Sequence, residues 1–178
     1  PEAKKPGTYA ASCLLARRMI ERDVRFVQIF LEEQPWDSHA DLSANHRGAC
    51  QRTDKPVAGL LRDLKQRGLL DSTLVVWGGE FGRTPKIFTF PGAKSKRPGR
   101  DHWGAVQTVF FAGGGVRGGN VVGSSDKIGA YPKSDLQRPE NMAATIYQAL
   151  GLPRTTAWTD PLDRPNLVYH GEPIAGLT

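Results

Sequence analysis

The chain has 178 residues, of which 39% are hydrophobic and 24% are charged, and it carries a formal net charge of +6 with a sequence pI near 9.6. This composition excludes a disordered chain, and no run approaches the about 18 apolar residues of a membrane span. The basic residues are dispersed without a nucleic-acid motif, so we expect no nucleic-acid partner. Two cysteines, Cys13 and Cys50, are too few for a disulfide framework, and we expect both to be small buried residues. The length suits one domain, residues 1–178.

The first half of the chain predicts a helix, a strand, a second helix and a second strand in that order. Helical spacing of apolar residues runs from Tyr9 to Arg22, and a nearly continuous apolar run at residues 24–31 predicts a buried strand. Asp54-Lys55-Pro56 predicts the start of the next helix, which Gly68 ends, and residues 73–77 predict another buried strand. This order implies a right-handed crossover between parallel strands.

The second half predicts a third strand at residues 106–112 and a last helix at residues 139–150, followed by an irregular tail that wraps the body. The glycines of residues 113–118 match a dinucleotide pattern, but an extended run follows them, so a wide hairpin loop is the better interpretation. We therefore predict an α/β fold with a mostly parallel sheet and flanking helices. In such a fold, functional loops follow the carboxyl ends of the strands.

Asp37 and His39 follow the predicted strand at residues 24–31 directly. Residues i and i+2 of an extended segment point to the same side, so both side chains can reach one cation. A carboxylate and an imidazole are common ligands of divalent metals. The alternative is a surface turn in which Asp37 bonds its own backbone.

Glu80 and Arg83 lie in the sequence GGEFGRTP, just past the second predicted strand. Glu80 is a candidate metal ligand or general base. Arg83 suits a phosphate or sulfate group, because its guanidinium can donate two parallel hydrogen bonds. The alternative is that Glu80 and Arg83 pair with one another and brace the loop.

Asp101 and His102 lie in the sequence GRDHW. Adjacent residues of an extended chain face opposite ways, so His102 is the better ligand candidate. Asp101 is a candidate for binding a second ion, for orienting a histidine or for pairing with Arg100. His46 and Cys50 would share a face of a helix, and both a soft-metal site and a supporting or surface role stay open for His46.

A basic group at residues 94–100 precedes His102. Charge runs of this kind are most often solvated loops. The functional alternative is that this loop attracts an anionic substrate toward His102.

The motifs WDSHADL, GGEFGRTP, GRDHW and AGGGVRGG, in this order, resemble the C-terminal part of a bacterial sulfatase-like family of unassigned function in the alkaline phosphatase superfamily. The resemblance covers residues 10–176. It implies an alkaline-phosphatase-like fold, and divalent metal ions (Zn²⁺, or Ca²⁺, Mg²⁺ or Mn²⁺) that bind phosphate or sulfate esters. It also implies export to the periplasm, and a nucleophile in an N-terminal part of the same protein that is missing from this chain.

By position, Asp37 and His39 look like the Asp and His ligands of that superfamily, and His102 looks like its late metal-binding histidine. Glu80 stands where relatives carry an Asp-His or Asp-Asn pair. The resemblance therefore implies a metal-dependent hydrolase-like domain, incomplete as given, that acts on sulfate or phosphate esters of small molecules or polysaccharides. The alternative is a non-catalytic binding module, for example for a sulfated polysaccharide. The predicted metal ligands are Asp37, His39, Glu80, Asp101 and His102, and the predicted catalytic residues are Glu80 and Arg83.

Overall fold

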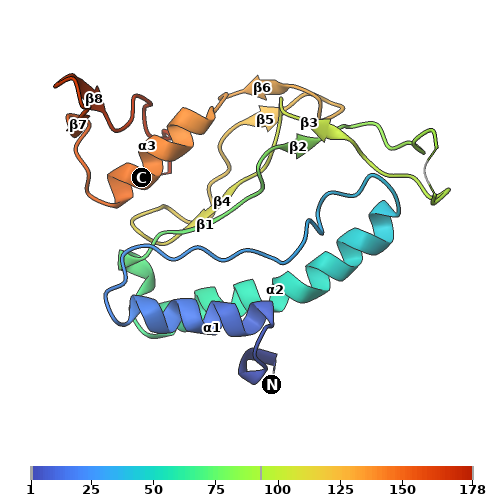
Figure 1. Cartoon of the computed structure of the whole chain (residues 1–178), viewed down its shortest axis with the longest axis horizontal. Helices are drawn as coiled ribbons and strands as arrows, with labels where there is room; N and C mark the ends of the chain where they lie inside the picture. Colours follow the sequence, from blue (N-terminus) through green and yellow to red (C-terminus); the bar gives the residue numbers. More distant parts are fainter. Residues whose placement is uncertain (1, 93, 178) are drawn as a thin grey trace.

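The computed structural model describes residues 2–92 and 94–177 (Figure 1). Helices α1 (Tyr9–Ile20) and α2 (Leu42–Gln66) lie together along one side of the molecule. Short strands and helix α3 (Pro139–Ala149) lie on the other side, and a segment without regular secondary structure runs between the two groups. Two short 3₁₀ helices, η1 (Glu2–Lys4) and η2 (Leu70–Ser72), flank α1 and α2 in the sequence.

The structure confirms the predicted first and last helices. α1 begins after Thr8, whose hydroxyl accepts a hydrogen bond from the backbone N–H of Ala11 at 3.1 Å. α3 begins with Pro139 in its first turn, where the missing N–H of proline would be unpaired in any case. Cys13 on α1 is buried as predicted, whereas Cys50 on α2 is only half-buried.

The C-terminal tail, predicted to be irregular and to wrap the body, contains the antiparallel pair of β7 (Ala157–Thr159) and β8 (Pro165–Leu167), and its last part packs on α3. Tyr169 of the tail stacks on Tyr147 of α3, with ring centroids 5.1 Å apart. The backbone N–H of Ile174 donates a hydrogen bond to the hydroxyl of Thr145 at 2.9 Å. These contacts bury Ile174 and Tyr169 and fix the path of the tail along the helix.

The second helix is much longer than predicted. α2 begins at Leu42, not at Asp54, and passes through Pro56. A proline inside a helix removes the hydrogen bond to the carbonyl four residues earlier and costs about 3 kcal/mol. The packing of α2 on α1 and the burial of Leu64 offset this cost. Across the described residues, no helix meets the length and hydrophobicity that a membrane span requires.

The predicted mostly parallel sheet with flanking helices is wrong, because the strands of the described chain form antiparallel pairs. β4 (Phe110–Ala112) lies within the predicted third strand and runs antiparallel to β1 (Val75–Trp77), with Trp77 opposite Phe110. The chain therefore reverses direction between β1 and β4. The right-handed crossover predicted between residues 24–31 and 73–77 is absent among the described residues, because residues 24–31 form no strand. An apolar run indicates burial and not strand direction, so the sequence pattern fits either arrangement. The pairs are β1 (Val75–Trp77) with β4 (Phe110–Ala112), β2 (Gly82–Arg83) with β3 (His102–Trp103), β5 (Ser124–Ser125) with β6 (Pro132–Ser134), and β7 (Ala157–Thr159) with β8 (Pro165–Leu167).

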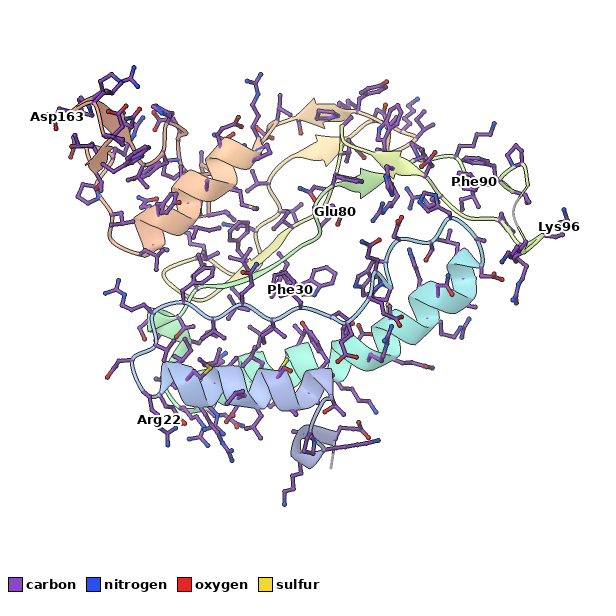
Figure 2. The ribbon with its side chains drawn as sticks, viewed as in Figure 1. Arg22, Phe30, Glu80, Phe90, Lys96 and Asp163 are labelled. Atoms are coloured by element: carbon purple, nitrogen blue, oxygen red, sulfur yellow. The ribbon has the colours of Figure 1, made fainter. Side chains whose placement is uncertain are left out.

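Residues 24–31, predicted to be a buried strand, form no strand. Among the described residues, the backbone of residues 25–33 makes no hydrogen bond to other backbone groups, and we call this stretch the open segment. Phe26 and Phe30 are 66% and 76% exposed, and Figure 2 shows Phe30 between the open segment and the β1–β4 pair. β-branched and aromatic residues favour an extended chain, but a strand also needs a neighbour to pair with.

Candidate metal centre

Three loops from distant parts of the sequence converge on the β2–β3 pair. The antiparallel register of this pair sets Arg83 opposite His102. Just before β3, the backbone N–H of Arg100 donates to the carbonyl of Ser38 at 2.9 Å, which ties the loop of residues 37–39 to the pair. A Cβ atom on Gly99 would lie 2.1 Å from the carbonyl carbon of His39, so only glycine allows this approach.

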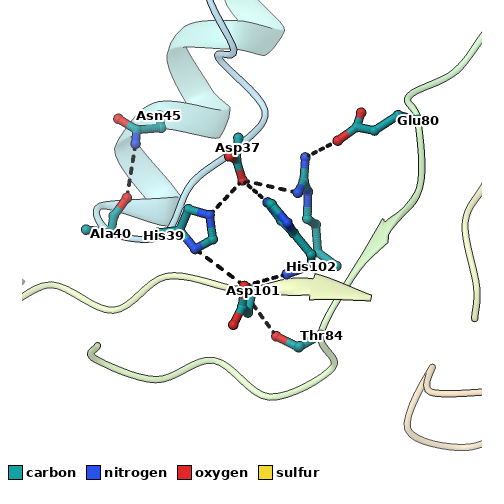
Figure 3. A network of polar contacts seen from close by, with 9 residues as sticks. Asp37, His39, Ala40, Asn45, Glu80, Thr84, Asp101 and His102 are labelled. Atoms are coloured by element: carbon teal, nitrogen blue, oxygen red, sulfur yellow. Dashed lines mark hydrogen bonds and ion pairs between the residues drawn. The ribbon is translucent and has the colours of Figure 1, made fainter. Parts of the chain in front are cut away.

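Asp37, His39 and His102 form a cluster in which one ligand atom from each residue lies within 4.8 Å of the others. Asp37 Oδ1 is 3.1 Å from His39 Nε2 and 3.0 Å from His102 Nε2 (Figure 3). The side-chain oxygen of Asp37 thus faces the two imidazoles and not its own backbone. The three side chains form a candidate metal-binding triad, as the spacing of Asp37 and His39 predicted.

The triad lies at the surface, between two aromatic rings. The side chains of His39 and His102 are 41% and 47% exposed, whereas that of Asp37 is 20% exposed. The ring of Phe90 meets His39 edge-on with centroids 5.1 Å apart, and the ring of Phe81 meets His102 at 4.9 Å. A ligand can therefore approach from solvent, while the aromatic rings restrict the positions of both imidazoles.

Asp37 is the electrostatic centre of the cluster. Burial by itself would raise the pKa of its carboxyl, but the hydrogen bond with His102 and the charges of His39, Arg83 and His102 together lower the pKa below its ordinary value. Arg83 Nη1 lies 3.1 Å from Asp37 Oδ1. Asp37 is therefore ionised at neutral pH, which is the form that binds a metal ion.

Asp101 lies behind the triad. Its Oδ1 is 3.7 Å from Nδ1 of His39, the ring nitrogen that does not face Asp37. The same oxygen accepts the backbone N–H of His102 at 2.8 Å, and the Asp101 backbone N–H donates to Thr84 Oγ1 at 3.0 Å. Of the three roles that the sequence left open for Asp101, this geometry agrees with orienting a histidine.

Arg100 links the loops that carry the cluster, a role that sequence reasoning missed. Its guanidinium donates to the backbone carbonyl of Arg83 at 2.9 Å and also to that of Thr84. In the described chain it forms no ion pair with Asp101. A planar guanidinium suits two neighbouring carbonyl acceptors, but the GRDHW motif carries no signal for this role, because only the folded chain places those carbonyls beside Arg100.

Glu80 lies outside the triad and pairs with Arg83. Arg83 Nη2 is 2.8 Å from Glu80 Oε1, and the Glu80 side chain is 59% exposed, compared with 13% for Arg83. Because Arg83 also contacts Asp37, it connects the carboxylate of the triad to that of the GGEFGRTP loop. This geometry agrees with the alternative in which Glu80 and Arg83 brace the loop.

His46 and Cys50 both lie on α2, and neither belongs to a metal-ligand cluster among the described residues. The ring of His46 meets Trp36 edge-on, with centroids 5.6 Å apart. Trp36 in turn meets Trp77 of β1 at 6.1 Å. His46 therefore packs against Trp36, the residue next to Asp37, which agrees with the supporting role left open for it.

Comparison with known proteins assigns the chain to a family but gives it no activity. The family model described as "Protein of unknown function (DUF1501)" matches residues 1–178, so the chain belongs to the DUF1501 family. No curated protein and no solved structure matches it. The assignment to a sulfatase-like family of the alkaline phosphatase superfamily is therefore wrong, because the matching model is DUF1501 and no sulfatase or alkaline phosphatase model matches. The short antiparallel pairs also differ from the large central sheet that this assignment implied.

Proposed function

We propose that Asp37, His39 and His102 bind one divalent metal ion, and that this metal centre serves the hydrolysis of phosphate or sulfate esters. The observation that carries the proposal is the approach of one carboxylate oxygen and two imidazole nitrogens within 4.8 Å of one another. Two nitrogens and one oxygen are a known donor set of catalytic zinc sites, which keep a fourth position open for water or substrate.

The distances in the triad suit a small tetrahedral ion. Ligand atoms about 2.1 Å from such an ion lie about 3.4 Å apart. The separations of Asp37 Oδ1 from His39 Nε2 and His102 Nε2 are 3.1 Å and 3.0 Å, so small movements would admit the ion. Zn²⁺ is therefore the ion that we expect, and Mn²⁺ is the second choice. Ca²⁺ and Mg²⁺ are disfavoured because they prefer oxygen ligands.

Arg83 is the group that we propose for binding the anionic part of an ester. Its guanidinium is held between the carboxylates of Asp37 and Glu80. Glu80 is the more exposed partner, so a phosphate or sulfate group would replace it on the guanidinium fork. The released Glu80 carboxylate would then be free to accept a proton from an attacking water molecule. The bound metal ion would supply polarisation of an ester oxygen.

Asp101 is proposed as the residue that orients His39. A carboxylate on the second ring nitrogen of a metal-binding histidine fixes its tautomer and the direction of its ligand nitrogen. The contact of 3.7 Å between Asp101 Oδ1 and His39 Nδ1 supports this role. A shortening of this contact to a hydrogen bond is expected when His39 binds metal through Nε2.

A second candidate function is a metal-dependent binding module without catalysis. One observation favours it: Arg83 already pairs with two carboxylates, so an anionic ligand can exchange with Glu80 without any chemical step. The two functions share the metal centre. They differ in whether an ester bound there is turned over.

A further polypeptide segment of the same protein is proposed to pack on the open segment. Two observations support this proposal: the backbone of residues 25–33 makes no hydrogen bond to other backbone groups of the described chain, and the rings of Phe26 and Phe30 are exposed. Hydrogen exchange tests it: the amides of residues 25–33 should exchange quickly in the 178-residue chain and be protected in a longer form of the protein. Export to the periplasm stays a prediction from the sequence.

Elemental analysis after saturation with Zn²⁺ and desalting tests the metal centre. We expect stoichiometric zinc in the unaltered chain and its loss in His39→Ala and His102→Ala. His170→Ala is the matched control, because His170 is exposed and belongs to no metal-ligand cluster among the described residues. Equal zinc content in all four proteins would contradict the proposal. Release of nitrophenol from nitrophenyl phosphate and nitrophenyl sulfate by the zinc-loaded chain would separate hydrolysis from binding alone.

A further inference from the structure

The chain between β2 and β3 forms an arm that is anchored at the metal centre. We call residues 86–98 the basic arm, of which residues 86–92 and 94–98 are described. At its base, the backbone groups of Phe88 and Gly99 exchange two hydrogen bonds, of 3.1 Å and 2.9 Å. Gly99 packs against the backbone of His39, and the ring of Phe90 meets the His39 ring. The base of the arm therefore touches one proposed metal ligand directly.

The arm carries positive charge that the described chain leaves without carboxylate partners. Residues 86–98 contain four basic side chains and no acidic one. Arg97 pairs with Asp41, at the start of α2. Within the described residues, Lys86, Lys94 and Lys96 form no ion pair. A ligand with several negative charges would complement this surface.

The charged end of the arm lies away from the triad. Figure 2 shows Phe90 on the inner part of the arm and Lys96 at its outer end. Lys96 is three residues from Gly99, a span of up to about 10 Å for an extended chain. Lys96 thus lies beyond the part of the arm that touches His39, and a ligand with several negative groups would suit both Arg83 and the outer lysines.

The aromatic rings of the arm are already covered, which disfavours a nucleic acid. Phe88 and Phe90 pack on one another with centroids 4.3 Å apart. The ammonium group of Lys86 lies over the Phe88 ring at 5.8 Å. Proteins that bind single-stranded nucleic acids stack the bases on open aromatic faces, whereas here Phe88 and Phe90 already contact one another and the side chains of Lys86 and His39.

We propose that the basic arm binds a polyanionic carbohydrate, a chain of sulfated sugars, and aligns it so that one of its sulfate groups reaches Arg83 and the triad. This inference rests on the proposed ester chemistry of the metal centre and specifies the shape of its substrate. The outer lysines bind the sulfates that are not being hydrolysed.

A heparin-derived decasaccharide is the probe, and its unsulfated counterpart is the control ligand. We expect the chain to bind the sulfated probe at about 50 mM salt and to lose most of the affinity at about 200 mM salt. Lys94→Ala/Lys96→Ala should weaken binding about tenfold, because two charge contacts are lost. Lys4→Ala/Lys5→Ala removes the same charge near the N-terminus, which Figure 1 shows beside α1 and away from the arm, and should leave the affinity unchanged.

Several results would overturn the inference. The first is equal affinity for the sulfated and the unsulfated decasaccharide. The second is an equal loss of affinity in the two double-lysine variants. The third is equally tight binding of a single-stranded DNA that carries the same charge. Zinc content is measured on the same samples and should be unchanged in Lys94→Ala/Lys96→Ala. If the protein holds zinc but does not bind the sulfated decasaccharide, the arm proposal alone is refuted. If the protein holds no zinc but binds the decasaccharide through the arm, the metal centre alone is refuted.

Discussion

The Nε2 atom of His102 lies 3.0 Å from Oδ1 of Asp37, although the two residues are 65 positions apart in the sequence. Among the described residues, no strand pair contains both of them. Their approach depends on a few backbone contacts between loops, chiefly those of Gly99 and Arg100. The metal centre should therefore be sensitive to substitutions that leave all three ligand side chains in place.

Gly99→Ala should damage the metal centre. The new methyl group would lie 2.1 Å from backbone atoms of His39 and would force the loop of residues 37–39 away from β3. We expect the zinc affinity to fall by roughly 10–100-fold, as it does when groups that support metal ligands are lost. Gly104→Ala is the control, since nothing lies within 4 Å of a Cβ atom there. Competition with a fluorescent zinc chelator measures both variants, and equal affinities would contradict this account of Gly99.

Arg100→Lys should also weaken zinc binding, although it keeps the positive charge. Lysine lacks the planar fork that donates to the carbonyls of Arg83 and Thr84. Loss of one charge-assisted hydrogen bond costs about 2 kcal/mol, which predicts a lower midpoint of urea unfolding. Arg97→Lys, at a position where the side chain is 73% exposed, should behave like the unaltered chain. A normal unfolding midpoint and normal zinc affinity in Arg100→Lys would show that the fork is dispensable.

The contact between α1 and α2 should be acid-sensitive through Asp63. Hydrogen bonding to Arg67, followed by the charges of Arg17 and Arg67, lowers the pKa of Asp63 below its ordinary value. A carboxyl with a lower pKa in the folded state stabilises the fold above its unfolded pKa, and this contribution disappears as the pH falls through the folded pKa. Asp63→Asn should therefore be less stable than the unaltered chain at pH 7, and the difference should shrink below about pH 4. Urea unfolding across this pH range measures the difference, and a constant difference would contradict the ion-pair explanation.

The two thiols should react at different rates. Burial raises the pKa of the Cys13 thiol to about 11, so it stays protonated and shielded at mildly alkaline pH. Cys50 is only half-buried. At about pH 8, iodoacetamide should label Cys50 in the folded chain and both cysteines after denaturation. Peptide mass spectrometry reads out each site, and early labelling of Cys13 would mean that the packing of α1 does not bury it.

The sequence predicted those parts of the candidate site that depend only on local backbone geometry. The i, i+2 spacing of Asp37 and His39 requires only an extended backbone to bring both side chains to one side, and the structure has them there. The choice of His102 over Asp101 also followed from local chain direction. Only His102 belongs to the triad, while Asp101 lies behind His39.

The fold was predictable only for its isolated helices. α1 and α3 have clear apolar spacing and termini, whereas α2 continues through Pro56 because tertiary packing outweighs one lost hydrogen bond. The direction of β4 and the lack of a partner for the open segment depend on contacts between distant residues. The pairing of Arg100 with two backbone carbonyls has the same origin, because carbonyl positions are a property of the folded chain.

X-ray absorption at the zinc edge of the zinc-loaded chain is the most direct test of the metal centre. The account predicts a first shell with two imidazole nitrogens and carboxylate or water oxygens at about 2.0–2.1 Å, and one imidazole fewer in His102→Ala. A shell that contains sulfur, or that keeps both imidazoles in His102→Ala, would show that the zinc ion lies elsewhere and would contradict the triad.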